Sequence, residues 1–190
     1  MSLNNKNQNA AIAKLADEHG RLVFHTAYRL LGNSHSAEDV TQEVFIKLFK
    51  KPTNAFDSIK NWPAYLRTMA SSAAIDQLRR RQRLAEESMD YSTNDEVPLL
   101  DKTQHNADPY REIALSRDIE HFSSALAELT AQDAHVFCLR HIEEFSYQEI
   151  AEQLGISNSL VGVTLHRAQQ KLSQLVGESQ FLGAGYEITG

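Results

Sequence analysis

Apolar residues recur at intervals of three and four along the chain, a spacing that predicts helices. The first block covers residues 12–31 and stops at Gly32. The next apolar stripe covers residues 40–49, for which Ser36 is the expected N-cap and Pro52 the expected end. With few glycines and prolines and abundant helix-forming residues, the pattern predicts an all-α fold.

The organisation of the chain changes after its third helical block. Pro63 suits the first turn of that helix, which finishes in the basic run 79–83. Residues 85–111 are polar, acidic and without periodicity, which indicates a flexible linker. Helical spacing resumes over 112–177, and the tail 178–190 is expected to fray. We therefore predict two small helical domains, 10–84 and 112–177.

The clearest motif lies in the second domain. Ser146 caps a short predicted helix, Gly155 permits the positive φ of a tight turn, and a second helix follows. Small Ala151 allows the two helices to approach, and Val161 fills the seam between them. This spacing predicts a helix-turn-helix, although a plain helical hairpin in a bundle remains the structural alternative.

Composition and charge narrow the possible functions. The single Cys138 lies in an apolar stretch and reads as a buried small hydrophobe, and no apolar run is long enough to span a membrane. A cytoplasmic protein without membrane insertion is expected. The net charge of −6 is uneven, because residues 1–85 hold 13 Lys and Arg against 7 Asp and Glu, whereas 86–190 hold 6 against 18.

Two helical faces are candidates for contact with nucleic acid. A polar stripe whose arginines would attract phosphate is expected to point outward from the third helix: Arg67, Ser71, Ser72, Asp76, Arg79 and Arg80. Polar residues that suit a major groove are expected on the exposed face of the last helix: Ser159, Thr164, His166, Arg167, Gln170 and Lys171. Solvated helix faces look similar, so both assignments have a structural alternative.

These motifs resemble those of the bacterial sigma factors of the extracytoplasmic-function (ECF) group, which retain conserved regions 2 and 4. The matching segments are 37–45, 62–66 and 74–80 in the first domain and 126–129, 136–140, 145–151, 154–157 and 165–168 in the second. Two motif sets in this order on either side of a polar linker are more specific than a helix-turn-helix alone.

The resemblance implies a set of partners and roles. It places Asp39, Gln42 and Glu43 where the family docks on core RNA polymerase, although complementing the helix dipole would be the default explanation of this acidic turn. It implies that the outward residues of the third helix recognise the minus-ten promoter element and that the last helix recognises the minus-thirty-five element. The acidic linker would follow the RNA exit path. An anti-sigma factor is a further implied partner, and no cofactor, metal or catalytic residue is implied.

Four positions depart from the family pattern. Ser72 stands where many relatives carry Asn, Gly162 and Thr164 where Lys or Arg is frequent, and Gln169 where Arg is common. Fewer charges mean fewer phosphate contacts and a shallower dependence on salt. We therefore expect weak DNA binding by the second domain in isolation, with polymerase supplying most of the affinity of this acidic chain for promoter DNA.

Two other classes of function are alternatives. A dedicated repressor or activator would use the helix-turn-helix without polymerase and would bind duplex DNA tightly alone. An enzyme is disfavoured, because the sequence has no His-Glu-x-x-His, no Cys pair, no glycine-rich phosphate loop and no Gly-x-Ser-x-Gly.

Overall fold

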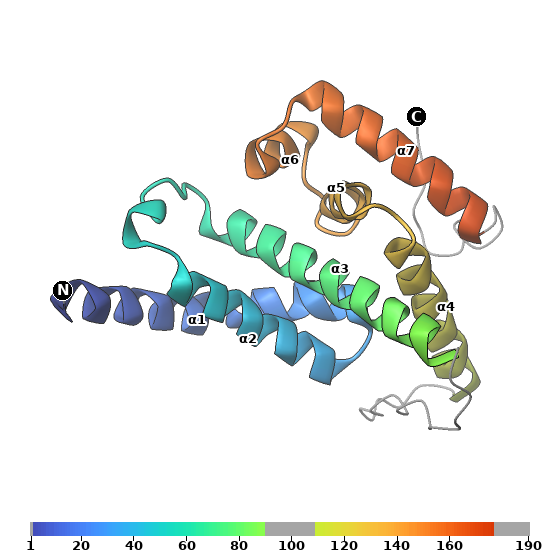
Figure 1. The fold of residues 1–190 in the computed structure, drawn as a ribbon, viewed down its shortest axis with the longest axis horizontal. Coiled ribbons are helices and arrows are strands. Elements are labelled where there is room, and N and C mark those ends of the chain that lie inside the picture. The colour runs from blue at the N-terminus through green and yellow to red at the C-terminus, as the bar shows by residue number, and fades with distance from the viewer. Residues whose placement is uncertain (1, 90–108, 177–190) are drawn as a thin grey trace.

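The computed structural model describes residues 2–89 and 109–176, and every regular element in these ranges is helical, which confirms the all-α prediction (Figure 1). In chain order the elements are α1 (Ser2–Leu31), α2 (Ser34–Lys50), the short 3-10 turn η1 (Thr53–Ala55), α3 (Trp62–Met89), α4 (Pro109–Ala127), α5 (Ala131–His141), α6 (Tyr147–Leu154) and α7 (Asn158–Val176). Most of the predicted linker and the whole predicted tail lie outside the described residues. None of the described helices is long and apolar enough to cross a membrane.

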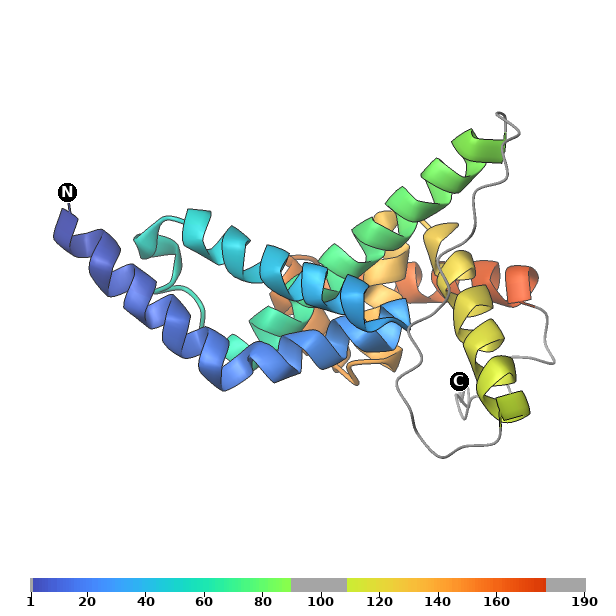
Figure 2. The same cartoon turned by 90° about the horizontal axis from the view of Figure 1, so that it is seen from below.

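The first helical unit consists of α1, α2 and α3, which pack against one another around a core that includes Val23, Leu30, Val40 and Leu66 (Figures 1 and 2). The break predicted between the first two helices is present. Gly32 has a φ of +69°, a left-handed conformation that favours glycine.

Helix α2 begins earlier than the sequence suggested, so the prediction of Ser36 as N-cap is wrong. Asn33 is the N-cap: its backbone is extended, and its side chain accepts a hydrogen bond from the Ser36 backbone N–H at 2.8 Å. Asn caps helices as well as Ser does, and the turn at Gly32 delivers the chain to this position. Glu38 and Asp39 therefore lie beyond the first turn of the helix.

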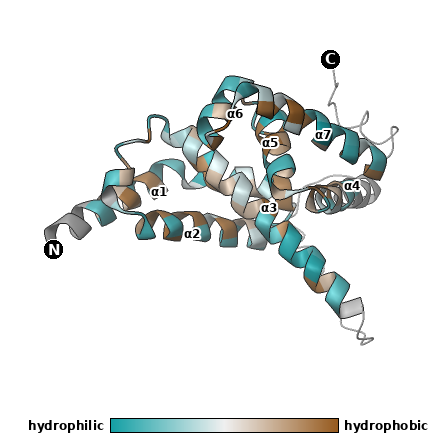
Figure 3. Ribbon diagram, turned by 45° about the horizontal axis from the view of Figure 1, so that its top comes forward, coloured by the Kyte–Doolittle hydropathy of each residue, from teal (hydrophilic) through white to brown (hydrophobic). Residues whose placement is uncertain are grey.

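Helix α3 is buried on two sides over its first half. The face with Leu66, Ala70 and Ala73 packs on α1 and α2, whereas the face with Ser71 and Ile75 turns toward α5. The helix continues to Met89, beyond the basic run where we expected it to finish. Figure 3 shows this far end as strongly hydrophilic, in keeping with a solvated helix made of good helix formers.

The second unit consists of α4 to α7 and contains the predicted helix-turn-helix. A capping box starts α6, because the Ser146 hydroxyl accepts from the Glu149 N–H while the Glu149 carboxylate accepts from the Ser146 N–H. Gly155 ends α6 with a φ of +65°. Val161 of α7 is fully buried where α7 packs on α6. Both predictions are confirmed. Cys138 is buried, as expected.

The two units pack against each other. Helices α4 and α5 lie across α3, as Figures 1 and 2 show from two directions. The Ser123 hydroxyl of α4 donates to the Leu30 carbonyl of α1 at 3.0 Å, and Gln82 of α3 donates to Glu128. Ile119 of α4 lies directly over Gly32. The described structure is therefore a closed arrangement of the two units.

Replacing Gly32 by Ala is expected to destabilise the chain by about 2–4 kcal/mol. The left-handed backbone costs an alanine about 1 kcal/mol, and its Cβ would lie 2.8 Å from the rigid Ile119 Cγ2, an overpacking that adds about 1–3 kcal/mol. Gly155→Ala is the matched control, because it has a similar φ but nothing within 4 Å of the added Cβ. Urea unfolding followed by circular dichroism measures both, and equal losses would contradict the packing argument.

Candidate nucleic-acid interface

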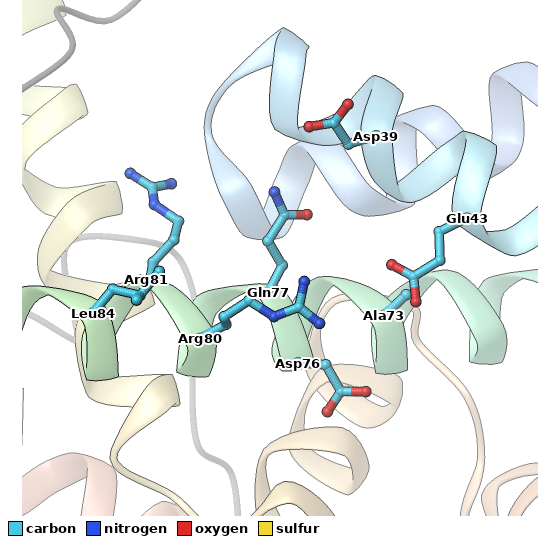
Figure 4. Close-up of a pocket in the computed structure, with 8 residues that line it drawn as sticks. All are labelled: Asp39, Glu43, Ala73, Asp76, Gln77, Arg80, Arg81 and Leu84. Carbon is cyan, nitrogen blue, oxygen red and sulfur yellow. The ribbon is translucent and has the colours of Figure 1, made fainter.

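A cleft between α2 and α3 brings the acidic residues that we predicted for polymerase docking beside the basic helix. Its volume is about 210 Å³. Figure 4 shows Glu43 from α2 and Arg80 from α3 reaching into this cleft. The residues that line it are Asp39, Glu43, Ala73, Asp76, Gln77, Arg80, Arg81 and Leu84. The polymerase-docking and minus-ten candidates therefore share one part of the surface.

The acidic face of α2 has no explanation from the helix dipole. Since the helix starts at Ser34, no acidic residue lies in its first turn, where carboxylates complement the dipole. Asp39 and Gln42 are exposed and Glu43 is half-buried and ion-paired with Lys47 at 2.8 Å. Complementation of the helix dipole therefore does not explain the acidic residues of this turn.

Two apolar side chains extend the same face of α2. Ile46 and Phe49 follow Asp39 by seven and ten residues, so they continue the line of Gln42. They are 49% and 47% exposed, and the prediction that Phe49 belongs to the buried stripe is wrong, because its position on the helix turns it away from α1 and α3. An acidic start followed by exposed apolar side chains is suited to protein contact.

The minus-ten candidates divide between two sides of α3. Asp76 and Arg80 are exposed, and Ser72 and Arg79 are half-buried. Ser71 is fully buried, and its hydroxyl has no hydrogen-bond partner among the described residues, so its expected outward orientation is wrong for this arrangement. Ser71 lies one helical turn beyond Arg67, on the side that faces the second unit. The contact between units thus covers part of the predicted interface.

A buried carboxylate joins the second unit to the first. Glu143, in the turn after α5, has a side chain only 1% exposed. It accepts a hydrogen bond from Arg29 of α1 at 2.5 Å and lies 3.6 Å from the Arg67 Nε of α3. The Thr26 hydroxyl also donates to it, at 3.3 Å. This cluster, which we call the Glu143 latch, engages one of the minus-ten candidates.

His135 of α5 lies at the same contact between the units. Its Nε2 is 3.0 Å from the Thr68 carbonyl of α3. Burial lowers the pKa of His135 below its ordinary value, while the Thr68 carbonyl and the Asp76 carboxylate act in the opposite direction. The neutral imidazole is therefore the form that suits the closed arrangement.

We expect acidification to lower the stability of the folded chain through His135. Because the folded pKa is lowered, the unfolded chain takes up a proton first, so this part of the stability is present above about pH 6.5 and is lost as pH falls toward the folded pKa. His135→Gln should reduce the difference in urea stability between pH 7.5 and 5.5. His141→Gln is the comparison, since burial also lowers the pKa of His141, but its recorded side-chain contacts lie within the second unit. An unchanged pH dependence in His135→Gln would refute this.

The last helix offers a narrower reading face than the sequence suggested. Ser159, His166, Gln170 and Lys171 are exposed. Thr164 is fully buried, so its expected place on the exposed face is wrong; it follows Val161 by three residues and lies on the packed side of the helix.

Arg167, the remaining candidate for the minus-thirty-five element, is exposed but forms an ion pair within the second unit. Its Nε lies 3.0 Å from both carboxylate oxygens of the buried Asp133 of α5. This bidentate pair gives Arg167 a structural role that the sequence did not reveal, because Asp133 is 34 residues away.

An aromatic cluster at the start of α3 escaped the sequence analysis. Trp62 packs edge-on against both Phe56 and Tyr65, and the Lys51 ammonium lies 4.8 Å from the centre of the Tyr65 ring. Aromatic faces and nearby cations are the groups that hold unstacked bases. The sequence feature that could have indicated this cluster is Trp62, the only tryptophan in the chain, which precedes Pro63.

Comparisons with known proteins agree with this architecture of two helical units and a helix-turn-helix. Residues 15–84 match Sigma-70 region 2, and residues 119–172 match Sigma-70, region 4. The chain is 32% identical to the ECF RNA polymerase sigma factor SigL of Mycobacterium tuberculosis, over 86% of this chain and 87% of that protein. It is 28% identical to SigW of Bacillus subtilis, over 88% and 89% respectively.

Two further proteins are similar to the chain over most of its length. The chain is 33% identical to SigE of Mycolicibacterium smegmatis over 84% of its own length, but it spans only 59% of that protein. The sigma factor RpoE from Bartonella quintana, solved in complex with the anti-sigma factor NepR, has a similar fold, with a TM-score of 0.51 and 22% identity over 87% of this chain and 96% of that one. The chain belongs to the ECF sigma factors of the sigma-70 family.

Proposed function

We propose that this chain directs core RNA polymerase to a limited set of promoters and assists in opening the DNA there. The observation that carries the proposal is the presence of both sigma regions in order, on two helical units that each place a candidate DNA face on a helix. Its role is binding rather than catalysis, exercised in the cytoplasm, where polymerase works.

We assign the polymerase contact to the face of α2 formed by Asp39, Gln42 and Glu43. The exposed Ile46 and Phe49 support this assignment, because a protein partner would bury them. An anti-sigma factor, as in the complex of the Bartonella relative, would compete for the same face.

We assign minus-ten recognition to Arg67, Ser71, Ser72, Asp76, Arg79 and Arg80, with the aromatic cluster beside them. Promoter DNA is the proposed ligand, and the bases of one strand would stack on these aromatic faces as the duplex opens. For the minus-thirty-five element we retain Ser159, His166, Gln170 and Lys171.

The closed arrangement implies a step before DNA is bound. Because Ser71 is covered and Arg67 is engaged by Glu143, we propose that the two units separate before the minus-ten face is used. The contact leaves the Ser71 hydroxyl and the Arg67 Nε without hydrogen bonds, and each such buried group costs about 1–3 kcal/mol. The closed arrangement is therefore less stable because of the same groups that we propose to contact DNA.

Run-off transcription tests the proposal. Core polymerase with the purified chain should yield transcripts with defined starts from a library of genomic fragments, and core polymerase alone should not. Tight, sequence-specific binding to duplex DNA without polymerase, together with no promoter-specific product, would instead identify a dedicated repressor or activator.

A further inference from the structure

Two consecutive residues of α7 disfavour a helix, and nothing in the described fold requires them. Glycine inside a helix costs roughly 1 kcal/mol relative to alanine. A Cβ added to Gly162 would lie 3.7 Å from Tyr147 Cε2, an ordinary van der Waals distance, so alanine would fit. Val163 has a branched side chain that loses rotamer freedom in a helix, and it is 61% exposed.

Val163 stands at the centre of the outward face of α7. Ser159 precedes it by four residues, and His166 and Gln170 follow it by three and seven, so all four side chains lie on one face. All four are exposed, whereas Leu165 and Ala168 are buried on the other side. An apolar group therefore sits among side chains that donate and accept hydrogen bonds.

The charges of α7 indicate what approaches this face. The second half of the chain is strongly acidic, yet α7 carries no Asp or Glu from Asn158 to Val176. Its charged residues are Lys171 and Arg167, of which Arg167 is paired with Asp133. The neighbouring α6 carries Glu149 and Glu152. A helix free of carboxylates within an acidic unit fits a polyanion better than it fits a neutral protein surface.

We propose that Gly162 and Val163 read the 5-methyl group of a thymine in the upstream promoter element. In the major groove only thymine presents a methyl group, and an apolar side chain is the group that detects it. The missing side chain at Gly162 lets the backbone of α7 approach the base edge closely. This assignment rests on the proposed function and adds a base identity to it.

The test removes the thymine methyl group from the DNA and, separately, shortens the Val163 side chain of the protein. Once a promoter has been mapped, each thymine of its upstream element is replaced by uracil, which lacks only the methyl. With wild-type holoenzyme, one replacement should weaken promoter binding by about threefold to fivefold, as expected for one lost methyl contact. With Val163→Ala holoenzyme, which keeps the Cβ but lacks the two γ-methyl groups, the same replacement should have a clearly smaller effect.

Stability measurements separate this role from a structural one. Val163→Ala and Gly162→Ala should leave thermal stability unchanged or raised while weakening promoter binding. Gly20→Ala is the matched control, because Gly20, like Gly162, lies in a helix and has room for an added Cβ. It should affect stability alone.

Three outcomes would overturn the inference. The first is a wild-type holoenzyme that is indifferent to every uracil. The second is an effect of uracil that is undiminished in Val163→Ala. The third is a loss of polymerase binding by Val163→Ala, which would mark a protein contact. In each case promoter-specific transcription by the wild-type chain would still stand, so failure of the inference is distinguishable from failure of the proposed function.

Discussion

Glu143→Gln should open the chain. The substitution removes the charge that Arg29 and Arg67 share, while the side chain keeps nearly the same shape. Both arginines are partly exposed, so water compensates for part of the loss, and we expect the closed arrangement to weaken by about 1–2 kcal/mol, a five- to thirtyfold rise in the ratio of open to closed chains.

Fluorescence energy transfer between the two units measures this opening. Cysteines introduced by Lys14→Cys in α1 and Ser173→Cys in α7 replace exposed residues. The native Cys138 is fully buried, and burial raises the pKa of its thiol, so it resists labelling. Transfer should fall in Glu143→Gln relative to the wild-type background, with helical content unchanged.

Glu144→Gln is the matched control for the latch. It removes the same charge from the neighbouring position, but Glu144 is exposed and forms no ion pair recorded in the described structure. Its transfer efficiency should equal that of the wild-type background. If Glu143→Gln behaves in the same way as Glu144→Gln, the buried carboxylate does not hold the units together.

Local chemistry made most of the fold predictable. Ser146 and Gly155 act through hydrogen bonds and backbone angles within a few residues, so the helix-turn-helix followed from the sequence. The start of α2 was missed by three residues, because Asn33 and Ser36 are both good caps and only the direction in which Gly32 delivers the chain distinguishes them.

Long-range pairs explain what could not be predicted at the site. Arg29 and Glu143 are 114 residues apart, and no periodicity indicates such a partner. Helix α3 is covered on two sides by different units, so its sequence has no single apolar stripe that would mark Ser71 as buried. Thr164 shows the same difficulty, since a small polar residue on a packed face resembles one on a reading face.

Asp39→Lys is expected to weaken binding to core polymerase at least tenfold, roughly the effect of setting a like charge against a complementary partner. The proposed docking face of α2 is negative, so the partner surface on polymerase is expected to carry positive charge. Asp39 is exposed, so the substitution should leave unfolding by urea unchanged. Affinity is measured by the retention of labelled core polymerase at several salt concentrations, and the deficit should shrink as salt rises.

Asp39 is a cleaner test than Glu43, and Glu38 provides its control. Reversing Glu43 also breaks the ion pair with Lys47, which contributes about 0.3–0.5 kcal/mol to the helix and would confuse docking with folding. Glu38→Lys makes the same charge change one residue away, but on a face of α2 that does not line the cleft. If both variants lose polymerase equally, net charge rather than a defined docking face governs binding, and the assignment of Asp39 fails.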